Sequence, residues 1–593
     1  MTTTREQTAA AKRGRRAVGR ITAVAVGIGA CSLAAAPAAH PQTQADGTVA
    51  IRVVRAVDTS GKWTPVLEPG IGGVKVTLTD DSGNGIDGTT AADGTVTLSP
   101  AGTKATGGKY RVQVVNPKPG VLFPAFASRQ GLDGAPDQLS SNEEFVDLSG
   151  GKTISYTTGL WNPGDYCQKN ATLVTTCQPA GREAGSARTL VSFPYDARGV
   201  DGTDVHVTDI STKAETGNIY GIAWNKTDKR VFSTAQAKRT ADYGPGGPGA
   251  IYVTDLAQKK TSLWATVPNA GTTAHGTGTD DAFTDVAGRE SLGGVKITED
   301  GKDLFVVNLN DRKLYRYDAS AATAAAPKAV YPIPDPGCPA AGDWRPFGLG
   351  LQDGLGYLGG VCSAEPEIGE IGFETDGSML VAFRDRFADR GPAGPSPGTA
   401  GQILSGGDLN KACLANGTYV LDTNLGCGIT TPGKRFFDTS RMTFHHNAAF
   451  AGMALSKVES TIATSGFDPD NLYAVGYGTA WVQRLDGKPD PKHGLRLNPV
   501  KDAAPFGKGA SMGDLEVLCD QAPLQIGNRV WYDPERKGVQ LPGQKPVEGA
   551  TVHLYDESGK LVGTARTTKR GEYYFDDSTT TPTTSGSANR KAR

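Results

Sequence analysis

The chain carries the same short β-hairpin pattern near both of its ends. Residues 70–83 read GIGGVKVTLTDDSG and residues 546–559 read PVEGATVHLYDESG, and the two segments align without a gap. In both, apolar residues alternate with polar ones before an acidic residue, a serine and a glycine that can take a positive φ. Such alternation predicts a hairpin half buried against a second sheet. We therefore expect a modular β-protein in which one module is used twice.

The first forty residues predict export. A basic segment precedes an apolar stretch (21–36) and a site of small residues at Ala36-Pro37-Ala38. This order is typical of a secretory signal peptide, here residues 1–39. The apolar run is too short to predict a membrane-spanning helix. Because it lies within the signal peptide, no membrane span is expected after cleavage. Cys31 offers the alternative of a lipid-attachment cysteine, which cleavage after the small residues would remove.

The charge balance argues against two classes of partner. The chain of 593 residues has 61 Lys and Arg against 62 Asp and Glu, a net charge of -1. Without a basic excess, neither a nucleic-acid surface nor a membrane-binding surface is predicted. A chain of this length also exceeds what one hydrophobic core supports, so several domains are expected.

Short strands separated by Gly and Asp turns fill the middle of the chain. Segments such as GVKITEDGKDLFVVNLNDRKLYRYDAS (294–320) and NLYAVGYGTAWVQRLDG (471–487) alternate short apolar strands with tight turns. Even spacing with almost no helical period is typical of a series of sandwiches or of a radial propeller. The recurring order, a Gly-rich strand, a turn and two further strands, favours a propeller of roughly five to seven blades.

Residues 526–575 resemble a known repeat. The residues that carry the resemblance are Gly527, Val530-Trp531, Asp533, Gly538, Gln540, Pro546, Gly549, Val552-His553-Leu554, Gly571 and Tyr573-Tyr574-Phe575. The segment resembles the B-type repeat of Gram-positive serine-aspartate-repeat adhesins, the SdrD B-like domain, a prealbumin-like sandwich related to the B domains of collagen adhesins. Residues 46–162 resemble the same domain more loosely. A propeller-like region between two B-like domains is similar to large exported proteins of actinobacteria and other bacteria.

The expected fold class is all-β, with a prealbumin-like β-sandwich at each end of a β-propeller-like domain. The predicted parts are a signal peptide (1–39), a B-type sandwich (46–162), a propeller-like domain (165–520), a partial SdrD B-like sandwich (524–577) and a Ser/Thr-rich disordered tail (578–593). The last sandwich lacks later strands and no sorting signal follows it. The sequence therefore predicts an extracellular, released protein, with cell-wall association as the alternative if another domain binds the wall.

The resemblance implies a calcium loop, of the form Asp-x-Asn-x-Asp-Gly-x-Gln, in the last module. Asp533, Glu535 and Gln540 occupy ligand positions of that loop, and Lys537 stands where a third acidic ligand is needed. Calcium requires several converging oxygen atoms, and a lysine removes one and repels the ion. We expect a structural turn and no required cofactor, with calcium as the alternative.

Seven cysteines follow the predicted signal peptide and are candidates for disulfides. They are Cys167, Cys177, Cys338, Cys362, Cys413, Cys427 and Cys519. The first six form local pairs in sequence. Because the number is odd, either one thiol stays free or the pairing is not purely local. Cys519 paired with Cys167 or Cys177 would tie the end of the middle region to its start, and the sequence leaves both choices open.

Motifs for catalysis are not evident in the sequence. His445-His446-Asn447 is the most suggestive histidine cluster, but adjacent residues of a strand point to opposite faces. Acidic residues in or beside turns could line the mouth of a propeller, namely Glu290, Glu299, Asp300, Asp385 and Asp389. Such residues more commonly form turns.

The sequence thus favours a non-enzymatic, secreted or cell-surface protein with a structural or adhesive role. In this hypothesis the B-like modules are spacers and the propeller binds a surface protein or a polysaccharide. The alternative is a secreted propeller hydrolase or lactonase with a metal on its axis, because the same fold supports both functions.

Overall fold

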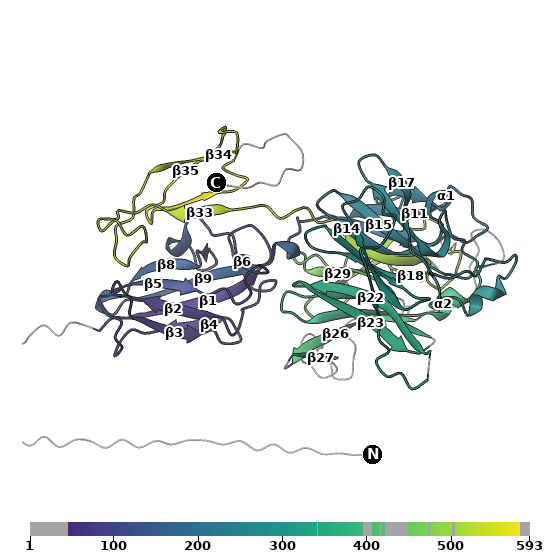
Figure 1. Ribbon diagram of the computed structural model, residues 1–593, viewed down its shortest axis with the longest axis horizontal. Helices are drawn as coiled ribbons and strands as arrows, with labels where there is room; N and C mark the ends of the chain where they lie inside the picture. The colour runs from purple at the N-terminus through teal and green to yellow at the C-terminus, as the bar shows by residue number, and fades with distance from the viewer. Residues whose placement is uncertain are drawn as a thin grey trace, which may run out of the picture. The chain divides into compact units, whose positions relative to one another are not determined.

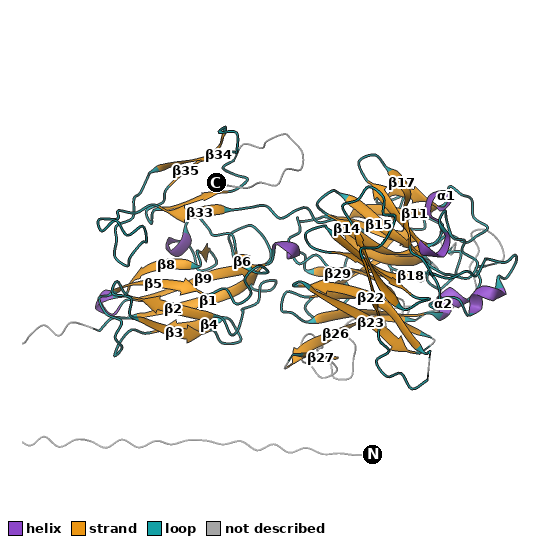
Figure 2. Cartoon of the chain, viewed as in Figure 1, coloured by secondary structure: helices purple, strands orange, loops and turns teal. Residues whose placement is uncertain are grey.

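The computed structural model describes residues 45–340, 342–363, 365–394, 406–415, 417–421, 449–471, 476–500 and 504–580. Within these residues the protein is almost entirely strand, turn and loop (Figure 2). The predicted signal peptide, Cys31, His445-His446 and Cys427 lie outside the described residues. In the described part of the chain, no helix has the length and apolar character needed to cross a membrane.

Two sheets with a common hydrophobic core form the N-terminal module. The first sheet contains β1 (Thr48–Ala56), β4 (Thr95–Leu98), β6 (Phe123–Pro124), β7 (Leu139–Ser140) and β9 (Thr153–Trp161). The second contains β2 (Lys75–Thr79), β3 (Gly85–Thr89), β5 (Lys109–Val114) and β8 (Glu143–Asp147). Alternate residues of β1 and β2, such as Ile51 and Val76, lie in this core. The period of two in the sequence therefore becomes one buried face on each sheet.

The repeated sequence pattern forms two hairpins with the same turn, as predicted. Strands β2 and β3 pair antiparallel, and so do β34 (Thr551–Tyr555) and β35 (Leu561–Arg566). In the first turn Asp80 Oδ1 accepts hydrogen bonds from the backbone N–H groups two and four residues later, at 3.0 and 2.8 Å. Asp556 Oδ1 does the same at 2.9 and 3.0 Å. The glycine of each turn has a positive φ, 83° and 82°, which explains its place in both copies.

Within residues 524–580, the C-terminal module has fewer strands than the N-terminal one. Its second strand pair is β33 (Ile526–Arg529) with β36 (Glu572–Phe575). Arg529 forms ion pairs with Glu572 and, at 2.6 Å, with the fully buried Glu144 of the N-terminal module. The sequence predicts that residues 578–580 belong to the disordered tail. In the structure they contact Asp576, which accepts hydrogen bonds from their backbone and side chains.

The body, which lies between these modules in the sequence, consists of six mostly antiparallel sheets, whose strands Figure 1 labels from β11 to β29. The first contains β10 (Thr172–Cys177), β11 (Arg188–Pro194), β13 (Thr208–Thr212) and β32 (Met512–Val517). The second contains β14 (Ile219–Asn225), β15 (Arg230–Ala235), β16 (Ala250–Asp255) and β17 (Lys260–Thr266). The third contains β18 (Leu292–Ile297), β19 (Asp303–Asn308), β20 (Lys313–Asp318) and β21 (Ala329–Pro332). The fourth contains β22 (Trp344–Gln352) and β23 (Leu355–Cys362).

The remaining sheets complete the body. The fifth contains β24 (Pro366–Phe373), β25 (Met379–Asp385), β26 (Gly407–Ala415) and β27 (Thr418–Leu421). The sixth contains β28 (Ala449–Ala454), β29 (Thr461–Phe467), β30 (Tyr477–Gln483) and β31 (Leu495–Arg496), to which β12 (Gly199–Val200) adds in parallel. Short helical segments lie in the connections, namely α1 (Lys213–Thr216) and α2 (Phe387–Arg390), and 3₁₀ turns at Gly131–Asp133, Ser149–Gly151, Pro163–Asp165, Gly247–Gly249 and Asp281–Thr284.

One strand from each of the six sheets contacts its counterparts in the neighbouring sheets. The order is β14, β18, β22, β24, β28, β32 and back to β14. The last strand, β32, pairs antiparallel with β10, so the two ends of the body share one sheet. Glycines permit this close approach, since an added Cβ on Gly452 of β28 would lie 2.2 Å from the carbonyl oxygen of Gly513 on β32. This ring of strands positions the candidate site.

Candidate functional site

A cluster of buried and partly buried charged residues lies where the ring strands converge. Lys296 comes from β18, Glu370 from β24, and Asp514 and Glu516 from β32. Lys296 Nζ lies 2.8 Å from Glu370 Oε1 and 3.5 Å from Glu516 Oε2. Asp514 accepts hydrogen bonds from the backbone N–H groups of Ile222, at 3.1 Å, and Leu515, at 2.8 Å. One lysine therefore faces three carboxyl groups.

Burial controls the protonation of this cluster. Burial raises the pKa of the Asp514 carboxyl to about 7, and it raises the pKa of Glu370 well above its usual range. The pKa of Glu516 is also raised by burial, with Lys296 opposing the shift. Burial alone would lower the pKa of Lys296, but Glu370 and Glu516 raise it, so the lysine stays protonated. The cluster thus holds a fixed positive charge beside carboxyl groups that retain protons toward neutral pH.

Three members of the cluster, Lys296, Glu370 and Glu516, line a cavity of about 250 Å³. Its wall also includes Trp224 and Phe373, which are apolar, and Glu299 and Lys457, which are charged. At its edge Lys457 Nζ lies 2.6 Å from Asp165, and Arg55 lies 2.7 Å from the same carboxylate. Although burial opposes it, these two cations lower the pKa of Asp165.

The cavity has the chemistry of a polar binding site. Lysine and carboxyl side chains both line it, so the complementary ligand is a polar one that forms hydrogen bonds. Among the described residues, no group of three or more His, Cys, Asp or Glu side chains has an arrangement that could hold a metal ion.

The acidic residues singled out in the sequence do not converge on one site. Glu299 lines the cavity and accepts a hydrogen bond from Asn162, at 3.1 Å. Asp389 is buried between two cations, with Lys238 at 2.9 Å. The other three serve loops or turns, where Glu290 binds Thr273, Asp300 binds Thr298 and the N–H of Lys302, and Asp385 binds the N–H of Phe387.

The residues of the implied calcium loop form a hydrogen-bonded turn. Asp533 Oδ2 accepts the backbone N–H of Gly538 at 2.7 Å. The carboxylate of Glu535 lies 2.6 Å from Lys537 Nζ, and Gln540 is buried. Because a lysine occupies the space around one of the required carboxylates, this arrangement does not fit a calcium ion.

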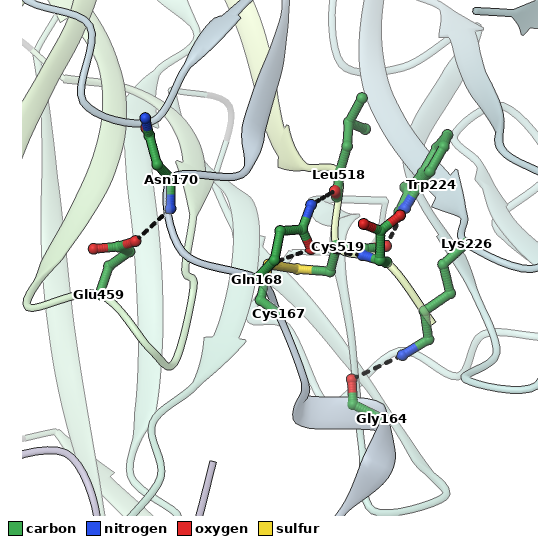
Figure 3. Close-up of a disulfide and its surroundings, with 10 residues drawn as sticks. Gly164, Cys167, Gln168, Asn170, Trp224, Lys226, Glu459, Leu518 and Cys519 are labelled. Carbon is green, nitrogen blue, oxygen red and sulfur yellow. Dashed lines mark hydrogen bonds between the residues drawn. A yellow bond between two sulfur atoms is a disulfide. The ribbon is translucent and has the colours of Figure 1, made fainter. Parts of the chain in front are cut away.

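The cysteines adopt a long-range pairing and a local one. Cys167 is joined to Cys519, which lies 352 residues later, and Cys338 is joined to Cys362. Figure 3 shows hydrogen bonds around the first pair, where Gln168 Nε2 donates to the carbonyl of Leu518 at 3.0 Å and Trp224 Nε1 donates to that of Cys519 at 2.7 Å.

Two further cysteines complete the account within the described residues. Cys177 stands in the buried strand β10 and is a free thiol, so it is not a disulfide partner. The structure uses the other cysteine near the start of the body, Cys167, which reaches Cys519 with Cα atoms 4.6 Å apart. Cys413 is also disulfide-bonded.

The central charged cluster was not among the residues that the sequence singled out. Each of its members lies in a strand that contains glycine, in GGVK, IGE and MGDLE. A charged residue inside an otherwise apolar, Gly-containing strand is the local signal that could have identified Lys296, Glu370 and Asp514, because buried charges need partners.

Comparisons with known proteins find two kinds of similarity. Colossin-C of Dictyostelium discoideum is 24% identical over 527 residues, which cover 73% of this chain and 51% of that protein. The chain covers 4% of Colossin-A. A fibrinogen-binding protein of Staphylococcus epidermidis is 40% identical over 52 residues, 9% of this chain and 5% of that protein.

The similarity to solved structures is weak. The β-propeller domain of Cps50 (Swd1) from Myceliophteria thermophila covers 68% of this chain and 96% of its own, with 11% identity and a TM-score of 0.28. The family whose model matches is the SdrD B-like domain, over residues 524–582. The C-terminal module is therefore similar to the SdrD B-like domain.

Proposed function

We propose that this chain is an exported structural or adhesive protein. Its B-like modules, 46–162 and 524–577, act as spacers, and residues 165–520 form a six-bladed β-propeller that presents a binding face. The ring of six strands and the pairing of β32 with β10 support the propeller. Disulfides of this kind persist in oxidising compartments, which supports export.

The fibrinogen-binding protein, which is 40% identical to this chain over 52 residues, is named for a protein ligand. By analogy, the partner of this chain is a surface protein or a polysaccharide. The buried charged cluster fits this non-catalytic role, since Lys296 is held by the surrounding carboxyl groups.

The Cys167–Cys519 disulfide is the observation that carries the spacer role. It connects the segment that follows the N-terminal module to the segment that precedes the C-terminal module. A force applied to the two ends of the chain passes through this covalent bond and bypasses the body. The propeller is thereby kept folded while the spacers bear tension.

Single-molecule pulling through residues 45–580 tests this role. With the disulfide intact, we expect length increases only from the spacer modules. In the double variant Cys167→Ser/Cys519→Ser the body joins the load path, and unfolding it should add about 1,200 Å, at ~3.4 Å per extended residue over the 352 positions that the bond spans. The matched control, Cys338→Ser/Cys362→Ser, should leave the body protected. Extension of the unreduced wild-type body by the full length would refute the spacer role.

Metal analysis tests the enzymatic alternative. A secreted hydrolase or lactonase with an axial metal requires a stoichiometric ion in the purified protein, and a chelator should then lower its melting temperature. We expect no stoichiometric metal and no effect of the chelator. A bound metal that survives dialysis would favour the enzyme.

A further inference from the structure

Strand β22 has a group of arginines near its first residues and the cavity lined by Lys296 at its last residues. This strand begins with Trp344 and Arg345, whereas its last residues, Leu351 and Gln352, line the cavity. At about 3.3 Å per residue, the strand separates the two places by roughly 20 Å. The arginines therefore form a second charged region, distinct from the cluster around Lys296.

Two guanidinium groups of this region meet at one backbone carbonyl. Arg345 Nη1 donates to the carbonyl oxygens of Gly342 and, at 3.0 Å, of Trp344. Arg312 Nη2 donates to the same oxygen of Gly342, at 3.3 Å. Like charges that converge in this way repel one another, and a single neutral carbonyl compensates them only in part.

Two more arginines lie close to this pair. Arg386 is buried, and its side chain packs on Gly288, where an added Cβ would lie 2.4 Å from Arg386 Cδ. Arg289 is the next residue and is exposed. Burial, followed by the charges of Arg289, Arg386 and Arg312, lowers the pKa of Arg345 to about 10. The guanidinium remains protonated at neutral pH, so the positive charge persists.

The nearby carboxylates do not neutralise this charge. Glu367 is shared by Arg384, at 2.7 Å, and Arg386, at 3.3 Å. Asp335 accepts two backbone N–H groups of its own loop, at 2.9 and 2.8 Å. The charge of Asp343 raises the pKa of Arg345, but this effect is smaller than the effects of burial and of the neighbouring arginines, which lower it.

Buried donors without partners point to a ligand. Arg345 is only 6% exposed, yet its Nε has no hydrogen-bond partner, and neither has the buried Nε1 of Trp344. Within the described ranges, Arg289, Arg312 and Arg345 form no ion pair with any carboxylate. A buried donor without an acceptor is costly, so an acceptor from outside the chain would relieve both the repulsion and the unmet hydrogen bonds.

We propose that Arg312 and Arg345 form a binding site for a doubly charged oxyanion, such as the sulfate or phosphate group of an acidic ligand. The planar guanidinium group suits two oxygens of such an anion. The proposal deepens the proposed binding role of the body by giving the ligand a chemistry, and it does not depend on the load path through the disulfide. The pulling experiment and the anion titration can therefore fail separately.

Calorimetric titration with sodium sulfate and with sodium phosphate, each against sodium chloride at equal ionic strength, tests the site. We expect sulfate or phosphate to bind wild-type protein and chloride to give no saturable signal. Arg345→Gln and Arg312→Gln should each weaken binding roughly tenfold to a hundredfold, the loss of one charge-assisted interaction. Arg345→Lys, which keeps the charge without the planar fork, should fall between the wild type and Arg345→Gln.

The matched control is Arg316→Gln. Arg316 lies on β20, where it already pairs with Asp303 at 2.6 Å, so the variant removes one positive charge from another place. It should bind the anion as the wild type does. Equal weakening in Arg316→Gln, or equal effects of sulfate and chloride, would mean general screening and overturn the proposal.

Thermal melting separates a ligand site from a structural role of Arg345. If the arginine serves to bind an anion, Arg345→Gln should melt no lower than wild type without sulfate, because repulsion is relieved. Sulfate stabilises most proteins through exclusion, so the measured quantity is the difference between the two proteins. Wild type should gain more from sulfate than Arg345→Gln does. A variant that melts lower without sulfate and gains as much from it would assign Arg345 to the fold alone.

Discussion

At the scale of single residues, burial shifts the pKa values of ionisable groups in this protein, because the charged form of a buried group loses its hydration. Asp514 lies in the ring of strands with backbone donors on both of its oxygens. Its carboxyl still has a pKa raised to about 7, because burial outweighs the attraction of Lys296. The folded protein therefore holds a proton that the unfolded chain releases near pH 4.

This proton predicts how stability changes with pH. The stabilising contribution is complete below the unfolded pKa and is lost as pH rises through the folded value of about 7. Between pH 5 and pH 8 the free energy of unfolding should fall, by up to about 1.4 kcal/mol per pH unit for one proton. Asp514→Asn should reduce this slope, as measured by urea denaturation across the range.

The control for the pH measurement is Asp300→Asn. Asp300 lies in an exposed turn; burial raises its pKa, but the hydrogen bonds from Thr298 and Lys302 together outweigh burial, so the pKa is lowered. Its contribution is complete above the unfolded pKa and falls only in acid, so the slope between pH 5 and pH 8 should match wild type. An unchanged slope in Asp514→Asn would contradict the assignment of the proton.

Burial also determines the reactivity of Cys177. The thiol is buried in β10 and its pKa is raised to about 11, chiefly by burial. Since the thiolate is the nucleophile, iodoacetamide at pH 8 should leave Cys177 unmodified in the folded protein. In denaturant without reductant the same residue should be alkylated completely, as peptide mass spectrometry can measure. Rapid labelling of the folded protein would show that this strand opens.

At the scale of elements, the loop between β33 and β34 differs from the implied calcium loop at Lys537, which stands where an acidic ligand is needed. Lys537 pairs with Glu535, so the carboxylate is held by a cation. Lys537→Asp removes that cation and adds a ligand beside Asp533, Glu535 and Gln540. We expect the variant to gain about 1–3 kcal/mol of stability in saturating calcium, seen as a rise in melting temperature that a chelator reverses. Wild type should show neither effect.

A lysine in the neighbouring hairpin provides the control for this loop. Lys560 follows the turn of β34 and β35, outside the Asp533 loop. Lys560→Asp makes the same change in charge, and calcium should not alter its melting temperature. A similar response in both variants would mean that calcium binds to added negative charge in general.

Elements whose contacts lie between residues near in sequence could be predicted from the sequence, whereas pairings of distant segments could not. The two hairpins follow from alternating residues and from turns in which Asp80 and Asp556 bind the next few N–H groups. The pairing of β10 with β32 has no such signal, because it joins segments separated by the whole body. Lys296 and Glu370 meet only through the ring, so their contact could not be predicted from either strand.

At the scale of the whole molecule, one covalent bond reinforces the closure of the body. Among the cysteines the sequence left Cys167 and Cys177 as equal partners for Cys519. Their positions relative to β10 distinguish the two cysteines in the structure. Cys177 is the last residue of β10 and pairs with Met512 of β32. Cys167 precedes β10 and is bonded to Cys519, which follows the end of β32. The bond thus reinforces the same closure that the backbone pairing makes.

This closure predicts unequal roles for the two disulfides. A crosslink stabilises mainly by restricting the unfolded chain, and the restriction grows with the length of the loop. The Cys167–Cys519 bond closes 352 residues and the Cys338–Cys362 bond closes 24. Removing the first should therefore cost about 6 kcal/mol and removing the second about 3.5 kcal/mol, as measured by denaturation of the two double serine variants.

The location of the loss distinguishes closure from a general weakening of the fold. The modules outside the long loop, residues 46–162 and 524–577, should keep their amide protection when the Cys167–Cys519 bond is removed. Protection should fall first in β10 and β32, because these strands close the ring and no other covalent link holds them together in the described chain. If the local bond costs more than the long one, or if protection falls evenly over all modules, the ring is not closed at this seam.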